Sequence, residues 1–382
     1  MVLIAGERTG VLSAEKNCEK FIFPQENRWT VLLATSNKIP SKEEVGSYFR
    51  KKYCILKLQA YLRSQLSQIM GDVNENDLEK DKEQLKVFLW CSPRTVSTAF
   101  TKCISFIKGV EVWSEPFVYC FLSTKEAKSH LGVDLPMVLE GNEEVFEKTT
   151  ELMRKMTASN VVTERIVYAN VKPRLEAAKG RYVFVKDMCL AMNKKVHQYL
   201  PRGFRHTFLI RTPEKALQSF RNSYFHHFKA QGLLHGEAAD ERTFDLLRDC
   251  PHMEESYNIT DVYDFWKYVR EEIEPNPIVI DADDLLTHPK EIMTKYCELV
   301  GLPFDESLLH WDSSLDTFKS WKQCGDDQLL NMVDFYGRAM NSSCFMPPNK
   351  PMPRDKMTPD VIKGIDKTMA SFLEMYEHRI KV

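Results

Sequence analysis

Short apolar runs alternate with segments of helical periodicity from residue 86 to the end of the chain. The apolar runs lie at residues 87–90, 110–113, 181–185, 206–210 and 277–280. Their length and their aromatic and branched side chains are typical of buried strands. Apolar residues recur at helical spacing in residues 214–228, 289–299 and 359–379. This alternation predicts an α/β protein, a three-layer α/β/α fold around a central parallel sheet.

The first 85 residues have a different pattern. They combine two short apolar runs, a segment of helical periodicity and a highly charged stretch, at residues 21–23, 31–34, 53–70 and 74–86. The runs predict short strands, and the charged stretch predicts a linker or the end of a surface helix. We therefore expect an N-terminal extension of uncertain structure, residues 1–85, followed by one α/β domain, residues 86–382.

The first strand of that domain runs into a hydroxyl-rich loop that opens a helix: Cys91, Ser92, Pro93, Arg94, Thr95, Val96, Ser97 and Thr98. Free backbone N–H groups at a helix start, together with the helix dipole, favour a bound anion. Two hydroxyl groups, from Ser97 and Thr98, and the guanidinium of Arg94 add further donors. A helix start that is merely capped by Ser or Thr is the alternative. The loop has no Walker A pattern, which disfavours an ATPase or a kinase.

A second cluster of anion-binding groups follows the strand at residues 206–210. Arg211 ends that strand, and Ser219 lies eight residues later, two turns into the next helix. The pair is suited to grip one phosphate from two sides. Alternatively, Arg211 caps the helix or pairs with Glu214. Two anion sites on one sheet, neither of them Walker A, predict a nucleotide that is phosphorylated at two ends.

With residues 281–311, these clusters resemble the sulfotransferase family, whose donor is 3′-phosphoadenosine 5′-phosphosulfate. The resemblance covers residues 86–325 and implies a parallel α/β fold related to nucleotide kinases. It implies that the loop residues Ser92 to Thr98 bind the 5′-phosphosulfate, and that Arg211, Ser219 and Lys322 bind the 3′-phosphate. The product would be adenosine 3′,5′-bisphosphate. Val96 stands where the family usually has Gly, so we expect the turn to use ordinary backbone angles or to shift slightly.

The resemblance also implies catalytic roles for groups at strand ends. Glu115, just after the strand at residues 110–113, is the expected base, and Arg94 faces the leaving phosphate in place of the family's usual Lys. Lys186 either binds the sulfuryl oxygens or pairs with Asp187. His226 and His227 are weaker candidates, for the acceptor pocket. The acidic residues Asp281, Asp283 and Asp284 are expected to form a structural turn rather than a metal site.

The charge, the cysteine content and the length of the apolar runs limit the kinds of partner that the protein is expected to bind. The net charge is −2, and the ten cysteines include no C-x-x-C pair. We therefore expect no nucleic acid partner, no metal and a reducing, cytoplasmic setting. No apolar run approaches the roughly 18 residues that span a bilayer, so no membrane association is expected. The expected acceptor is a small organic molecule with a hydroxyl or an amine, and a homodimer stays open. The alternatives are a nucleotide-binding or small-molecule kinase-like protein on the same fold, or a non-catalytic family member.

Overall fold

The chain divides into two units, residues 1–82 and 83–382. The computed structural model describes residues 22–25, 28–31, 84–250, 253–254, 256–326 and 328–382. In the first unit, β1 (Ile22–Gln25) pairs antiparallel with β2 (Arg28–Val31). These strands overlap both short runs predicted there. The helix predicted at residues 53–70 lies outside the described residues.

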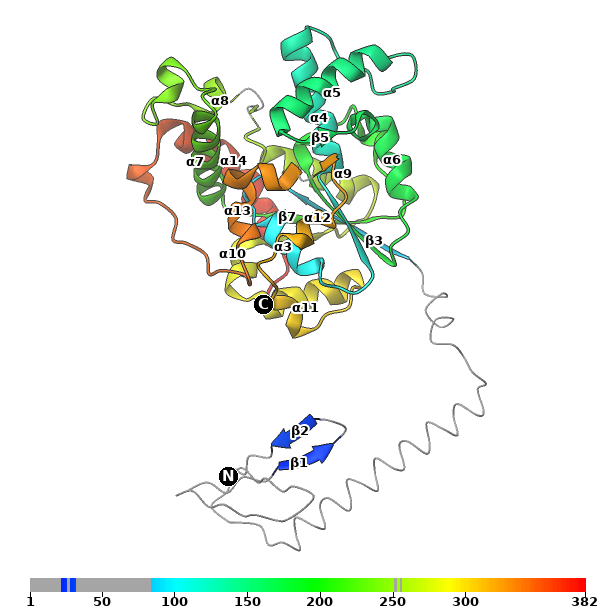
Figure 1. Cartoon of the computed structure of the whole chain (residues 1–382). Helices are drawn as coiled ribbons and strands as arrows, with labels where there is room; N and C mark the ends of the chain where they lie inside the picture. The colour runs from blue at the N-terminus through cyan, green and yellow to red at the C-terminus, as the bar shows by residue number, and fades with distance from the viewer. Residues whose placement is uncertain (1–21, 26–27, 32–83, 251–252, 255, 327) are drawn as a thin grey trace, which may run out of the picture. The chain divides into compact units, whose positions relative to one another are not determined.

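The second unit is built on a parallel sheet of five strands in the order β4-β6-β3-β7-β8 (Figure 1). The strands are β3 (Leu85–Cys91), β4 (Val110–Ser114), β6 (Tyr182–Met188), β7 (Arg205–Ile210) and β8 (Ile278–Asp281). Every neighbouring pair is parallel. All five predicted strands are present, and the predicted α/β class is confirmed.

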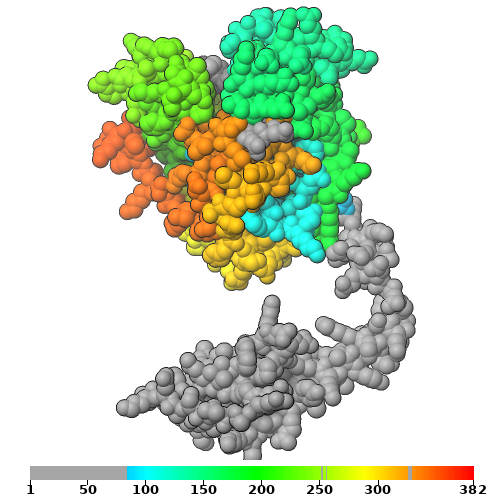
Figure 2. All heavy atoms as spheres, in the orientation of Figure 1, coloured from blue at the N-terminus to red at the C-terminus, as the bar shows by residue number. Residues whose placement is uncertain are grey.

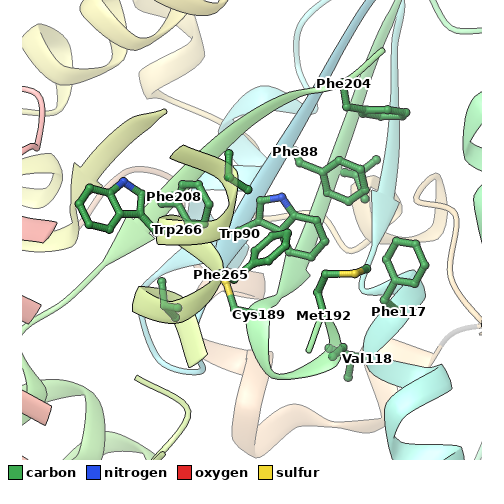
Figure 3. Packing of buried hydrophobic residues seen from close by; sticks show 14 of the residues in the cluster. Phe88, Trp90, Phe117, Val118, Cys189, Met192, Phe204, Phe208, Phe265 and Trp266 are labelled. Atoms are coloured by element: carbon green, nitrogen blue, oxygen red, sulfur yellow. The ribbon is translucent and has the colours of Figure 1, made fainter. Parts of the chain in front are cut away.

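Helices cover both faces of the sheet because side chains of a strand point alternately to its two faces. On one face, Phe88 and Trp90 of β3 stack with their ring centroids 4.5 Å apart, and Phe265 meets Trp90 edge-on at 4.8 Å (Figure 3). This cluster also includes Phe117 and Phe372. The helices that cover this face are α4 (Pro116–Glu126), α6 (Tyr168–Glu176), α9 (Thr260–Glu272) and α14 (Pro359–Glu377).

The opposite face of β3 presents Val87, Leu89 and Cys91 to a second buried cluster. Its helices are α3 (Ser97–Ile104), α10 (Ala282–Thr287) and α11 (Pro289–Val300). The sheet therefore lies between two layers of helices, as the sequence predicts. A strand buried on both faces explains why β3 reads as a continuous apolar run rather than an alternating one.

The remaining elements complete the second unit. They are α5 (Glu143–Thr157), α7 (Pro213–Ala230), α8 (Leu246–Asp249), α12 (Asp316–Lys319), α13 (Val333–Met340), β5 (Asn160–Val161) and β9 (Gly325–Asp326). The predicted helices at 214–228, 289–299 and 359–379 correspond to α7, α11 and α14. No helix in the described part of the chain is both long and apolar enough to cross a membrane.

Candidate functional site

The loop between β3 and α3 carries two residues in the left-handed region, Arg94 at φ 68° and Val96 at φ 59°. Of the two alternatives expected for the turn at Val96, ordinary backbone angles or a slight shift, the first is therefore wrong. Left-handed residues turn backbone N–H groups toward one side, which makes a concave site for an anion. Val96 also packs against the second buried cluster, and this contact offsets part of the strain at a branched residue.

The start of α3 has no side-chain cap in the structure. Its first backbone hydrogen bond runs from Phe100 N to Val96 O at 3.1 Å. The amides of Ser97, Thr98 and Ala99 precede that bond, and all three residues line a cavity of about 160 Å³. The interpretation of this loop as a merely capped helix start therefore does not hold. Uncapped amides at a helix N-terminus are suited to an anion.

The two predicted anion clusters meet at this cavity. Arg94 Nε donates to Ser219 Oγ at 3.1 Å, and Arg211 Nη1 donates to Arg94 O at 2.9 Å. Pro93, Arg94, Arg211 and Ser219 all line the cavity. Ser92 and Thr95 are buried instead, and the Thr95 hydroxyl donates to Ser92 O at 2.9 Å, which holds the loop in shape.

A third guanidinium, that of Arg338, faces the same cavity from α13. The sequence interpretation did not include it. Burial, and to a lesser extent the charges of Arg211 and Arg338, lower the pKa of Arg94 to about 10, so it stays charged at neutral pH. The like charges of three guanidinium groups in one small cavity repel one another unless an anion lies between them.

Arg211 is only loosely paired within the protein. Its Nε lies 3.9 Å from Asp283 Oδ1, and Asp283 Oδ2 is 2.5 Å from Lys215 Nζ. Glu214, the alternative partner considered from the sequence, is not its contact. Arg211 Nε is a buried donor with no hydrogen-bond partner among the described residues. An anion in the cavity would satisfy it.

Glu115 and Lys186 form a buried ion pair beside the cavity, and each side chain is 1% exposed. Glu115 Oε1 contacts Lys186 Nζ, while Glu115 Oε2 accepts a hydrogen bond of 2.9 Å from the hydroxyl of Tyr336. Burial is the largest influence on the pKa of Lys186 and would lower it, but the charge and hydrogen bond of Glu115 together with the charges of Cys91 and Asp187 raise the pKa overall. The Lys186 ammonium is therefore charged at neutral pH.

Asp187, the alternative partner of Lys186, forms hydrogen bonds with backbone N–H groups instead. The Asp187 carboxylate accepts backbone hydrogen bonds from Phe117 at 2.7 Å, Val118 at 3.2 Å and Met188 at 2.8 Å. It thereby ties the start of α4 to the end of β6. Burial raises the pKa of Asp187 to about 7.

Tyr336 and Lys186 line the cavity, whereas Glu115 lies behind them. The structure thus places the expected base next to the site without direct access to it. Tyr336 belongs to α13, which packs over α3; Lys102 Nζ, from α3, donates to Met340 O at 2.8 Å. In Figure 2 the segment around α13, in orange, lies against the cyan segment that contains α3.

Three other sequence candidates lie outside the cavity. Lys322 pairs by its backbone with the edge strand β4, donating to Val112 O at 2.8 Å, and its side chain lines a different cavity. Lys322 therefore does not lie with Arg211 and Ser219. His227 Nδ1 lies 2.9 Å from Asp334 Oδ2, away from the cavity. His226 does not line the cavity either.

The acidic turn after β8 is structural, as expected. Asp281 Oδ1 accepts hydrogen bonds from the backbone N–H groups of Asp283 at 2.9 Å and Asp284 at 3.0 Å, which caps α10. Among the described residues, no group of three or more His, Cys, Asp or Glu side chains has a metal-binding arrangement.

Solved structures with a similar chain path are sulfotransferase domains. One, from the Synechococcus PCC 7002 olefin synthase, is 14% identical with a TM-score of 0.34. The match covers 76% of this chain and 96% of that domain. The domain from the curacin biosynthetic pathway is 14% identical with a TM-score of 0.36. The match covers 75% of this chain and 99% of that domain. Mouse sulfotransferase SULT7A1, complexed with PAP, is 13% identical with a TM-score of 0.38. The match covers 79% of this chain and 92% of the mouse protein.

A curated protein of similar sequence comes from a plant. The branched-chain-amino-acid aminotransferase-like protein 2 of Arabidopsis thaliana is 24% identical over 228 residues, which are 59% of this chain. The matched part spans about a third (32%) of that relative's length. No protein-family model matches the chain. These similarities are distant, at 13–24% identity.

Proposed function

We propose that the chain is a sulfotransferase that moves a sulfuryl group from 3′-phosphoadenosine 5′-phosphosulfate to a hydroxyl or amine of a small organic acceptor. The observation that carries this proposal is the convergence of Arg94, Arg211 and Arg338 on one cavity, beside the uncapped start of α3. Such a set of donors matches a ligand with anionic groups at two places.

The residues present fit this donor in two parts. The amides of Ser97, Thr98 and Ala99, with Arg94, would hold the 5′ side, which carries the reacting group. Arg211 and Ser219 would hold the 3′-phosphate, and the orphaned Nε of Arg211 supports that assignment. Arg338 adds charge from α13. Three further properties remain predictions from the sequence: the cytoplasmic location of the protein, the lack of a nucleic acid or membrane partner, and the oligomeric state.

When bound, the donor supplies a sulfuryl group joined to a good leaving phosphate. Arg94 and the helix amides would stabilise the negative charge that develops on that phosphate. Lys186 is charged and faces the cavity, so it would attract the oxygens of the group in transfer. The acceptor must lose a proton. The Tyr336 hydroxyl would take that proton and pass its own to Glu115, which is hydrogen-bonded behind it.

Calorimetric titration with adenosine 3′,5′-bisphosphate tests the donor site. We expect binding that Arg94→Ala, Arg211→Ala and Arg338→Ala each weaken by about tenfold or more, since each removes a charge-assisted contact worth roughly 1.5–3 kcal/mol. Arg202→Ala, at an exposed arginine outside the cavity, is the matched control. Tight binding of ATP with none of the bisphosphate would favour the kinase-like alternative and overturn the proposal. Binding of the bisphosphate without sulfuryl transfer to any of a broad acceptor panel would favour a non-catalytic member.

A further inference from the structure

A second basic cavity, of about 520 Å³, lies at the outer edge of β4. Five cationic side chains from separate segments line it. They are Arg165 in the 3-10 turn Thr163–Ile166, Arg174 in α6, Lys179 after α6, Lys319 at the end of α12, and Lys322. None of the residues that line this cavity lines the one described above. In the sheet, β4 is separated by β6 and β3 from β7, the strand that leads to Arg211.

Acidic groups do not neutralise this cavity. Glu111 is the acidic residue in its lining, and both of its oxygens are engaged: they accept from Trp113 Nε1 at 2.9 Å and from Gly180 N at 3.1 Å. Lys319 pairs with Asp316 at 3.3 Å, but both side chains are more than half exposed and the pair is weak. Glu164 is close enough to act on the charge of Arg174.

Two arginines, Arg165 and Arg174, line the cavity. Arg165 Nη1 donates to Gln323 O at 3.0 Å, and the guanidinium of Arg174 lies over the indole ring of Trp113, 5.4 Å from its centroid. Among the described residues, neither arginine has a carboxylate within ion-pair distance. Burial and the nearby charge of Arg165 lower the pKa of Arg174. Half-buried guanidinium groups held close together, without an acidic partner, leave most of their donors open to a ligand.

We propose that this cavity binds a compact polyanion that carries two or more phosphate or sulfate groups. Arginine forks match the tetrahedral oxygens of both groups, and the three lysines add charge around them. A single carboxylate would leave most of the five positive charges unpaired. The cavity is separate from the donor site, so this inference does not rest on the proposed function.

Titration at low salt with two probes tests the inference: pyrophosphate for phosphate groups and a trisulfated disaccharide for sulfate groups. We expect at least one probe to bind, with an affinity that falls steeply as salt is added. Arg165→Ala and Arg174→Ala should each weaken binding about tenfold or more. Lys322→Glu should weaken it as well, and since its side chain is exposed, this variant keeps the fold even if an arginine variant does not.

Two control variants distinguish this cavity from others. Arg202→Ala changes an exposed arginine elsewhere and should leave the affinity for the probe unchanged. Arg211→Ala changes the donor cavity and should leave in place the binding that Lys322→Glu weakens. The inference is overturned if neither probe binds. It is also overturned if Arg211→Ala abolishes binding while the Lys322→Glu variant binds normally, because the probe would then occupy the donor cavity.

Discussion

The hydroxyl of Tyr336 donates a hydrogen bond of 2.9 Å to Oε2 of Glu115, across a separation of 221 residues in the sequence. Tyr336 forms part of the cavity wall, and Glu115 lies behind it with 1% of its side chain exposed. The Tyr336 hydroxyl therefore links the cavity to this carboxylate through a hydrogen bond, as the Lys186 ammonium does at the other carboxylate oxygen.

Replacing Tyr336 by Phe removes this bridge and keeps the ring. We expect sulfuryl transfer by Tyr336→Phe to slow by about 10²-fold, a typical contribution of acid–base catalysis, with unchanged affinity for adenosine 3′,5′-bisphosphate. A transfer assay with labelled donor and an acceptor panel measures the first, and calorimetry the second. Tyr263→Phe is the matched control, because Tyr263 donates a similar hydrogen bond of 2.7 Å to Glu374 at the surface. An unchanged rate in Tyr336→Phe would contradict the relay.

The ion pair of Glu115 and Lys186 makes a prediction about stability. Each single change, Glu115→Gln or Lys186→Gln, leaves one charge buried without its partner and should lower the free energy of unfolding by about 3–5 kcal/mol. The double variant should be more stable than the sum of the two losses implies, since it leaves no unpaired charge. Chemical denaturation of all four proteins gives the coupling energy.

An exposed pair provides the control for that cycle. Lys125 and Glu254 form an ion pair with side chains 34% and 57% exposed. Removing one of them should cost less than about 1 kcal/mol, because water replaces the lost partner. Additive losses at Glu115 and Lys186 would show that the two side chains are not coupled in solution.

The parts of the site that the sequence predicts are those that follow directly after a strand. Arg94 and Arg211 each come just beyond the end of a buried apolar run, and the carboxyl ends of parallel strands share one edge of a sheet. That geometry brings the loop and Arg211 together, and α7, which begins just after Arg211, carries Ser219 to the same cavity. Glu115 and Lys186 meet for the same reason, at the ends of β4 and β6.

The contribution of α13 is not predictable from its own residues. Tyr336 and Arg338 lie on a short helix that reaches the cavity only because it packs over α3, and no local motif indicates this. The misplacement of Lys322 has a related cause: its backbone continues the sheet beside β4, a pairing between distant segments that leaves no periodic signal. At Val96, tertiary packing overrides the local preference of a branched residue.

Val96 gives a prediction of its own, because it holds φ 59° without a glycine. Val96→Gly removes strain of roughly 1–3 kcal/mol, against a loss of roughly 0.5–1 kcal/mol from the flexibility of glycine in the unfolded chain. We expect a net gain of about 1 kcal/mol in the free energy of unfolding and unchanged affinity for the bisphosphate. Denaturant titration measures the stability. Val96→Ala, which keeps a Cβ in the same backbone conformation, should not give this gain, and a destabilised Val96→Gly would show that packing of the Val side chain matters more.

A buried histidine gives the protein a predictable response to acid. His206 is 2% exposed, and its Nδ1 accepts a hydrogen bond of 2.9 Å from Trp90 Nε1. An accepting nitrogen carries no proton, so the native structure requires the neutral ring. Burial lowers the pKa of His206 to about 4, whereas a histidine in the unfolded chain has a pKa of about 6.5.

Between these two values the unfolded state binds a proton that the folded state does not, so stability falls as the pH drops from 6.5 to 4. The difference of about 2.5 units corresponds to a loss of about 3 kcal/mol from His206. His206→Asn offers an oxygen to Trp90 and has no proton to bind, so its free energy of unfolding should decline less than that of the wild type over this range. Denaturation followed at several pH values measures the difference. The exposed His310 provides the control, since His310→Asn should reproduce the wild-type profile; a His206→Asn profile parallel to the wild type would mean that His206 is not the group that titrates.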